Sequence, residues 1–320
     1  MDNLSSQAIF VYTGPLADEA IKGRFTGHET FPLRYLWLYK AYKEVADAGK
    51  KKHRKNPFSD PDAIATFGVG KNMVNSIRHW ALACKIIKDG EDGLFEPDDI
   101  GEFLFDPESG RDRFMEKEAT LWLIHWMVAG RWERTSTWYY AFNYFSERKF
   151  EREDLVKSIR NLCTERGWKG ASETTIKRDV DCFLRSYVHR ADEKFSEDSI
   201  ESVLSELELI SAVGSHMYEF NYGPKPNLPE GIFLYSLNKF WNNQMPSQNS
   251  ASVEILTYSP GSPGRVFKLD EQSLVERLVG IGENSGGCFQ WTDTSGIRNV
   301  SRVKENIEST DLLDLAYADN

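Results

Sequence analysis

The eight residues Gly27–Arg34, which read GHETFPLR, place an imidazole, a carboxylate, a hydroxyl and a guanidinium just before an expected helix. His28 could act as a general base, and Glu29 could ligate a metal ion. Arg34 could stabilise the negative charge of a phosphorane. We therefore predict a catalytic site made of His28, Glu29 and Arg34, with Glu29 as the metal ligand.

The same segment also fits a purely structural interpretation. Thr30 could be the N-cap of the following helix, Pro32 could lie in its first turn, and Glu29 could pair with Arg34. The residue types alone favour this capping interpretation. The two interpretations differ in what a change of Glu29 would affect, which is activity in the first and stability in the second.

A second segment carries side chains suited to nucleic acid. At 100° per residue, a helix over Asn72–Ile87 turns Val74 and Ile77 to one face and polar side chains to the other. Cations contact phosphates, while Asn and Arg also read base edges. The alternative is an amphipathic helix with a solvated basic face. We favour DNA contacts, and the predicted ones are Lys71, Asn72, Asn75, Arg78 and Lys85.

The stretch Phe67–Asn72, FGVGKN, resembles a nucleotide-binding loop only superficially. A Walker loop requires Gly where Ala65 stands and Ser or Thr where Asn72 stands. Gly68 and Gly70 are therefore predicted to form a turn. The sequence contains no GxGxxG, HExxH, GxSxG or CxxC pattern and offers no independent proof of catalysis.

The elements around these segments predict a mainly α fold of serial winged helix-turn-helix-like modules with short β-hairpins. A helix over Phe31–Ala48 precedes a short helix over Ala63–Thr66, the glycine turn, the helix over Asn72–Ile87 and a strand-like piece over Leu94–Glu96. This is the order of elements in a winged helix-turn-helix.

A second region repeats this order of two helices separated by a turn. Helices are predicted over Glu153–Glu165 and Ser172–Val188, with Ser172 as the N-cap of the second helix. The polar face of that second helix carries Arg178 and Arg185, which we predict to contact DNA.

The chain divides into four predicted regions. These are an N-terminal DNA-contacting region over 1–148, a second helical region over 149–241, a linker over 242–252 with few contacts across it, and a C-terminal α/β module with an acidic tail over 253–320. If 296–306 is helical, Arg298 and Arg302 lie one turn apart and form a further DNA-binding or partner-binding pair. The alternative is that they pair with Glu305 and Asp293.

Composition and charge limit the classes of protein. The chain has 320 residues, of which 40% are apolar, and this excludes a disordered or collagen-like protein. The net charge of −10 excludes a uniformly basic surface, yet residues 22–88 hold fourteen Lys or Arg against five Asp or Glu. Acidic residues dominate 192–208 and 305–320. Four separated cysteines and no long apolar stretch favour a cytoplasmic protein without disulfides.

Three long motifs are similar to a known family. GHETFPLRYLWLYKAY (27–42), FGVGKNMVNSIRHWALACKII (67–87) and TLWLIHW (120–126) resemble a bacterial domain family, originally of unknown function, that occurs beside DNA phosphorothioation genes. WTDTSGIRNVSR (291–302) is similar to the C-terminal motif of that family. The family pattern falls on Gly27, His28, Glu29, Thr30, Phe31, Arg34, Gly68, Gly70, Lys71, Asn72, Met73, Ser76 and Arg78.

The resemblance implies a nickase that opens a DNA strand for sulfur insertion in phosphorothioate modification and antiphage defence. The implied partners are a cysteine desulfurase, an ATPase and a sulfurtransferase-like protein. Because phosphodiester cleavage commonly uses Mg²⁺, we expect Mg²⁺ or another divalent cation as cofactor. The alternative is a non-catalytic, sequence-specific DNA-binding adaptor that recruits modification enzymes. A transcription regulator is a weaker third possibility.

Overall fold

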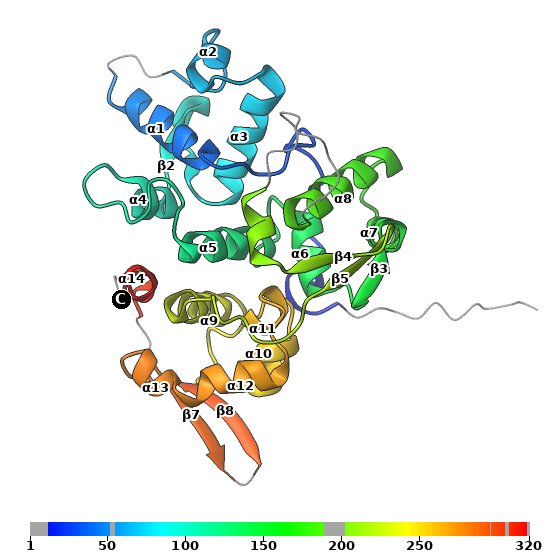
Figure 1. Cartoon of the computed structure of the whole chain (residues 1–320), viewed down its shortest axis with the longest axis vertical. Helices are drawn as coiled ribbons and strands as arrows, with labels where there is room; N and C mark the ends of the chain where they lie inside the picture. The colour runs from blue at the N-terminus through cyan, green and yellow to red at the C-terminus, as the bar shows by residue number, and fades with distance from the viewer. Residues whose placement is uncertain (1–11, 52–54, 189–201, 295, 305–306, 319–320) are drawn as a thin grey trace, which may run out of the picture.

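The chain is mainly α-helical, with three small antiparallel sheets, as expected (Figure 1). This computed structural model describes residues 12–51, 55–188, 202–294, 296–304 and 307–318. Most of the acidic stretch 192–208, as well as Glu305, lies outside the described residues. No described helix is both long and apolar enough to cross a membrane.

The N-terminal part contains the predicted sequence of helix, glycine turn, helix and hairpin. Its elements are α1 (Trp37–Gly49), α2 (Ala63–Phe67), α3 (Lys71–Ala83), β1 (Ile87–Asp89), β2 (Phe95–Pro97), α4 (Asp99–Phe105), α5 (Glu118–Ala129) and α6 (Ser136–Asn143). Gly68 ends α2 with φ +66°, a conformation that costs glycine little. Helix α3 packs against α1, and β1 pairs with β2.

Helix α3 is shorter than predicted. It ends at Ala83 because the chain turns sharply at Lys85, where φ is +55°, and Ile86 N–H bonds back to the Ala81 carbonyl. Ile87 then enters β1 instead of a further helical turn. Lys85 therefore lies beyond the helix and not on its polar face.

The middle part follows the expected pair of helices. It comprises β3 (Lys149–Glu151), α7 (Arg152–Glu165), α8 (Glu173–Tyr187), β4 (Ile210–Val213), β5 (Met217–Phe220) and α9 (Glu230–Gln244). The strand order is β3-β5-β4. Ser172 is confirmed as the N-cap of α8, since its side chain accepts a hydrogen bond from Thr175 N–H.

The C-terminal part is an α/β arrangement packed onto the rest. It contains β6 (Ser250–Ser252), α10 (Val253–Tyr258), α11 (Pro263–Val266), α12 (Glu271–Val279), α13 (Ile281–Asn284), β7 (Phe289–Thr294), β8 (Ile297–Arg302) and α14 (Ser309–Tyr317). The predicted helix over 296–306 is wrong, because β8 pairs with both β6 and β7 and buries Val300.

The expectation of few contacts across 242–252 is also wrong. Helix α9 occupies the start of this segment and β6 its end. Buried hydrogen bonds join the two sides: His125 Nε2 donates to the Val266 carbonyl at 2.8 Å, and Lys268 Nζ donates to the Phe142 carbonyl at 2.7 Å. Helix α14 also packs against α9. The C-terminal part therefore shares its core with the helices that precede it.

Candidate nucleic-acid interface

The loop that contains the GHET motif is not a helix start. Glu29 and Thr30 have φ values of +48° and +66°, and α1 begins only at Trp37, after Leu36 at +65°. The capping interpretation is therefore wrong, since Thr30 is not an N-cap. Non-glycine residues adopt positive φ at a cost and keep it only where the surroundings enforce it. The loop conformation is thus held by tertiary contacts.

His28 provides the central contact. It is 4% exposed, and its Nε2 lies 2.5 Å from Asp179 Oδ1 on α8. Its Nδ1 accepts the backbone N–H of Thr30 at 3.0 Å, so the ring proton sits on Nε2 and is donated to Asp179. Neither ring nitrogen has a free lone pair directed at solvent. His28 therefore fixes the loop, and this geometry does not fit the general base that we expected.

Two further sets of contacts hold the loop between α3 and α8 (Figure 1). From α8, Arg185 Nη2 donates to the Thr30 carbonyl at 2.6 Å. From α3, Trp80 Nε1 donates to the Phe31 carbonyl at 3.0 Å. Arg185, which we predicted to contact DNA, therefore binds the loop backbone instead. The side chain of Glu29 remains exposed at its tip.

Arg34 also differs from the expected role. Its side chain is 9% exposed, and its guanidinium lies over the rings of Phe31 and Trp37, at 5.8 and 5.5 Å from their centroids. Such stacking stabilises a buried cation. Arg34 thus packs beneath the loop, away from solvent.

Three arginines lie on segments close to the loop: the backbone N–H of Arg24 donates to Ser136 Oγ at 2.8 Å, near Arg134, and Arg78 adjoins His79, whose ring lies 5.8 Å from that of His28. Arg24 precedes the loop, Arg78 lies on α3, and Arg134 precedes α6. Burial and the neighbouring His28 hold the pKa of His79 well below its usual value. The positive charges of the three arginines lower this pKa further. Sequence reasoning identified only Arg78 of the three.

These arginines are differently engaged. Arg134 pairs with the exposed Asp89 at 2.7 Å. The side chains of Arg24 and Arg78 make no hydrogen bond or ion pair with another residue in the described ranges. Cations without an internal carboxylate partner are available to an external anion. The sequence held no signal for this grouping, because the three residues are far apart along the chain.

The other predicted DNA contacts lie on helices α3 and α8 and on the distant strand β8. Lys71 and Asn72 are exposed at the start of α3, and Asn75 is half-buried one turn further on. Arg178 is exposed on α8, two turns before Arg185. These residues lie on the two helices that contact the loop, so we treat the helices and the loop as one candidate interface.

Arg298 and Arg302 do not join this interface. Arg298 pairs with Glu271, and Arg302 donates to Asn238 Oδ1 at 3.2 Å. Both lie on β8, at the end of the molecule opposite α3 (Figure 1). Asp293, the pairing partner that we considered in the alternative, lies opposite Arg298 in the β7–β8 ladder.

In this interface, the loop offers one exposed carboxylate, that of Glu29, as a metal ligand. Within the described ranges, no three His, Cys, Asp or Glu side chains converge as a metal site. Mg²⁺ is commonly held by one or two carboxylates together with water and substrate phosphates. The exposed carboxylate of Glu29 is a suitable donor of this kind.

Fold and site together define a mainly α protein with cationic helices on both sides of a strained loop. The family described as "protein of unknown function (DUF4007)" matches residues 25–317, and the chain belongs to this family. This confirms the resemblance that the motifs indicated.

Two solved structures are similar to this chain. A magnesium ion-bound SspB crystal structure is 29% identical, with a TM-score of 0.79, and covers 92% of this chain and 87% of its own. An SspB crystal structure is 30% identical, also with a TM-score of 0.79, and covers 93% and 88%. No curated protein matches the sequence. The protein is therefore SspB-like in fold.

Proposed function

We propose that this protein nicks one DNA strand in phosphorothioate modification and antiphage defence. The observation that supports this most directly is an exposed carboxylate, Glu29, on a strained loop beside the cluster of Arg24, Arg78 and Arg134. Phosphodiester cleavage requires cations where charge develops on the phosphate, and it commonly requires a metal-bound water. The similarity to SspB structures, one of them magnesium ion-bound, supports the same assignment.

Each part of the interface has a distinct role in this proposal. Arg24 and Arg78, which have no carboxylate partner in the described ranges, hold the phosphate, and α3 lies against the duplex as the second helix of a winged helix-turn-helix. His28 and Asp179 keep the loop in its strained conformation and act as positioning residues. Glu29 would hold Mg²⁺, which would supply a nucleophilic water and neutralise phosphate charge.

Relaxation of supercoiled plasmid by purified protein tests the proposal. We expect open-circular product with Mg²⁺ and none with a chelator. Glu29→Gln should abolish nicking, whereas Glu108→Gln, at an exposed position outside the interface, should not change it. Intact supercoiled plasmid after incubation of the folded protein with Mg²⁺, Mn²⁺ or Ca²⁺ would contradict nicking by this chain alone.

A non-catalytic adaptor is the second candidate. One observation favours it: both nitrogens of His28 are occupied, so the expected group of three catalytic side chains is not assembled. An adaptor would bind DNA through the same arginines and bring a cysteine desulfurase, an ATPase and a sulfurtransferase-like protein to it. It would retard DNA with or without Mg²⁺ and leave the plasmid supercoiled, while a nickase would relax it.

A further inference from the structure

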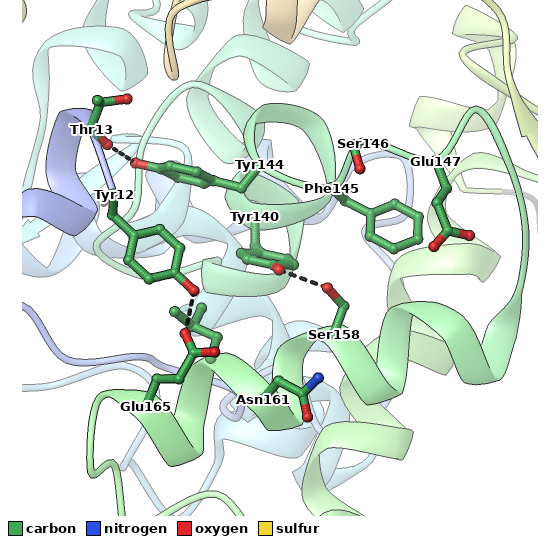
Figure 2. Close-up of a pocket in the computed structure, with 11 residues that line it drawn as sticks. Tyr12, Thr13, Tyr140, Tyr144, Phe145, Ser146, Glu147, Ser158, Asn161 and Glu165 are labelled. Atoms are coloured by element: carbon green, nitrogen blue, oxygen red, sulfur yellow. Dashed lines mark hydrogen bonds between the residues drawn. The ribbon is translucent and has the colours of Figure 1, made fainter. Parts of the chain in front are cut away.

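A pocket of about 370 Å³ lies between α6, α7 and the segment that contains Tyr12 (Figure 2). Aromatic rings form much of its wall, and the polar side chains of Asn161 and Glu165 reach it from α7. Its lining residues are Tyr12, Thr13, Tyr140, Tyr144, Phe145, Ser146, Glu147, Ser158, Asn161, Leu162 and Glu165. None of them belongs to the nucleic-acid interface, so the pocket needs a separate explanation.

The three tyrosines are held in place by their hydroxyl groups. Tyr12 donates to Glu165 Oε2 at 2.7 Å, and Tyr144 donates to the Thr13 carbonyl at 2.5 Å. The hydroxyl of Tyr140 shares a hydrogen bond with Ser158 Oγ at 2.7 Å. Because these hydroxyls already have partners, the rings and not the hydroxyls are the surface offered to a ligand. The wall is preorganised, which lowers the entropic cost of binding.

The ring arrangement is compact. The rings of Tyr140 and Tyr144 are stacked at 6.0 Å between centroids, and Tyr12 meets Tyr144 edge to face at 6.0 Å. The guanidinium of Arg166, which is not among the lining residues, lies 5.2 Å from the centroid of the Tyr12 ring. The ring of Tyr12 therefore already accepts a guanidinium group in the folded protein.

The charge of the pocket selects a cation. Its lining residues include two glutamates, Glu147 and Glu165, and no Lys or Arg. Within the described residues, the side chains of Glu147 and Asn161 form no hydrogen bond or ion pair, so both are available to a ligand. Carboxylates repel phosphate groups, and aromatic rings with nearby carboxylates favour cations.

We infer that this pocket binds the guanidinium group of an arginine side chain presented by a partner protein. A planar guanidinium stacks on a tyrosine ring while its forked N–H groups donate to a carboxylate and an amide oxygen, here those of Glu165 and Asn161. An ammonium group is compact and cannot stack in this way. The volume suits one side chain and not a helix or a nucleic-acid strand.

A titration with blocked amino acids tests this inference on the full chain. The probe is N-acetylarginine methylamide, which carries only the guanidinium charge, and its isosteric neutral control is N-acetylcitrulline methylamide. Amide chemical shifts, followed by nuclear magnetic resonance, should change at the pocket with the arginine probe and not with the citrulline probe. Equal shifts with citrulline, equal binding of the blocked lysine analogue, or tighter binding of free arginine would each overturn the inference.

Variants of two lining residues locate the site. Glu165→Gln removes the charge, and Tyr12→Leu removes the ring while Tyr12→Phe keeps it. We expect Glu165→Gln and Tyr12→Leu each to weaken binding about two- to fivefold, as for an exposed cation–π contact. Tyr12→Phe should bind nearly as well as the unaltered protein. Glu153→Gln, on the same helix but paired with Arg152 outside the pocket, is the matched control and should change nothing. Equal affinity in Glu165→Gln and Glu153→Gln would overturn the assignment.

Discussion

The strongest test of the interface concerns Arg24 and Arg78, whose side chains make no hydrogen bond or ion pair within the described ranges. Each cation that neutralises a phosphate of duplex DNA contributes about 0.9 to the slope of log K against log salt concentration. The double variant Arg24→Ala/Arg78→Ala should therefore lower that slope by about 1.8. Over a fourfold rise in salt, from about 50 to about 200 mM, the variant should lose about 12-fold less affinity than the unaltered protein.

Fluorescence anisotropy of a labelled duplex, in a chelator that prevents cleavage, measures this slope. The control is Arg148→Ala/Lys149→Ala, which changes the net charge equally but removes cations that pair with Glu219. The control should keep the original slope. Neither pair of substitutions removes a buried contact, so melting should change little. An unchanged slope in Arg24→Ala/Arg78→Ala, with melting intact, would refute phosphate binding at this cluster.

Three further outcomes are expected. Asp179→Ala should destabilise the protein by about 1–3 kcal/mol in urea unfolding, because it leaves the buried Nε2–H of His28 without an acceptor, and Asp179→Asn should cost less because it keeps an acceptor. Glu29→Gln should abolish nicking with a near-normal melting temperature, since Glu29 is exposed and caps no helix; a lower melting temperature with activity retained would contradict this role. Burial lowers the pKa of Lys225 from 10.5 to about 8, so the unfolded chain holds more protons between these values and stability should rise with pH there; Lys225→Met should remove this rise in urea unfolding.

Local signals in the sequence predicted local structure well. Ser172 was identified as an N-cap because a hydroxyl before a helical pattern satisfies the first backbone N–H groups, and its side chain does so. Gly68 marked a turn because glycine adopts positive φ freely. Leu36 and Thr30 adopt positive φ as well, but nothing in their residue types predicts it, because the surrounding contacts impose the conformation.

Residue spacing could not distinguish a helix from a strand over 296–306. Arg298 and Arg302 are four residues apart, which places them on one face of a helix and equally on one face of a strand. Only the pairing of β8 with β6 and β7 decides between the two, and β6 lies about fifty residues earlier in the chain than its partner residues in β8. The partner of His28 was likewise beyond sequence reasoning, since Asp179 is 151 residues away.

The GHET loop also determines how the two expected helix-turn-helix regions relate to one another. Independent modules in series would each present a cationic helix at an angle set by a flexible connection. Here Trp80 of α3 and Asp179 and Arg185 of α8 all hold the same short loop. A phosphate bound at Arg78 and one bound at Arg178 would therefore be kept at a fixed separation, with Glu29 between the two helices. In the proposed nickase, the two positive-φ residues of the loop present the exposed carboxylate of Glu29 between these helices.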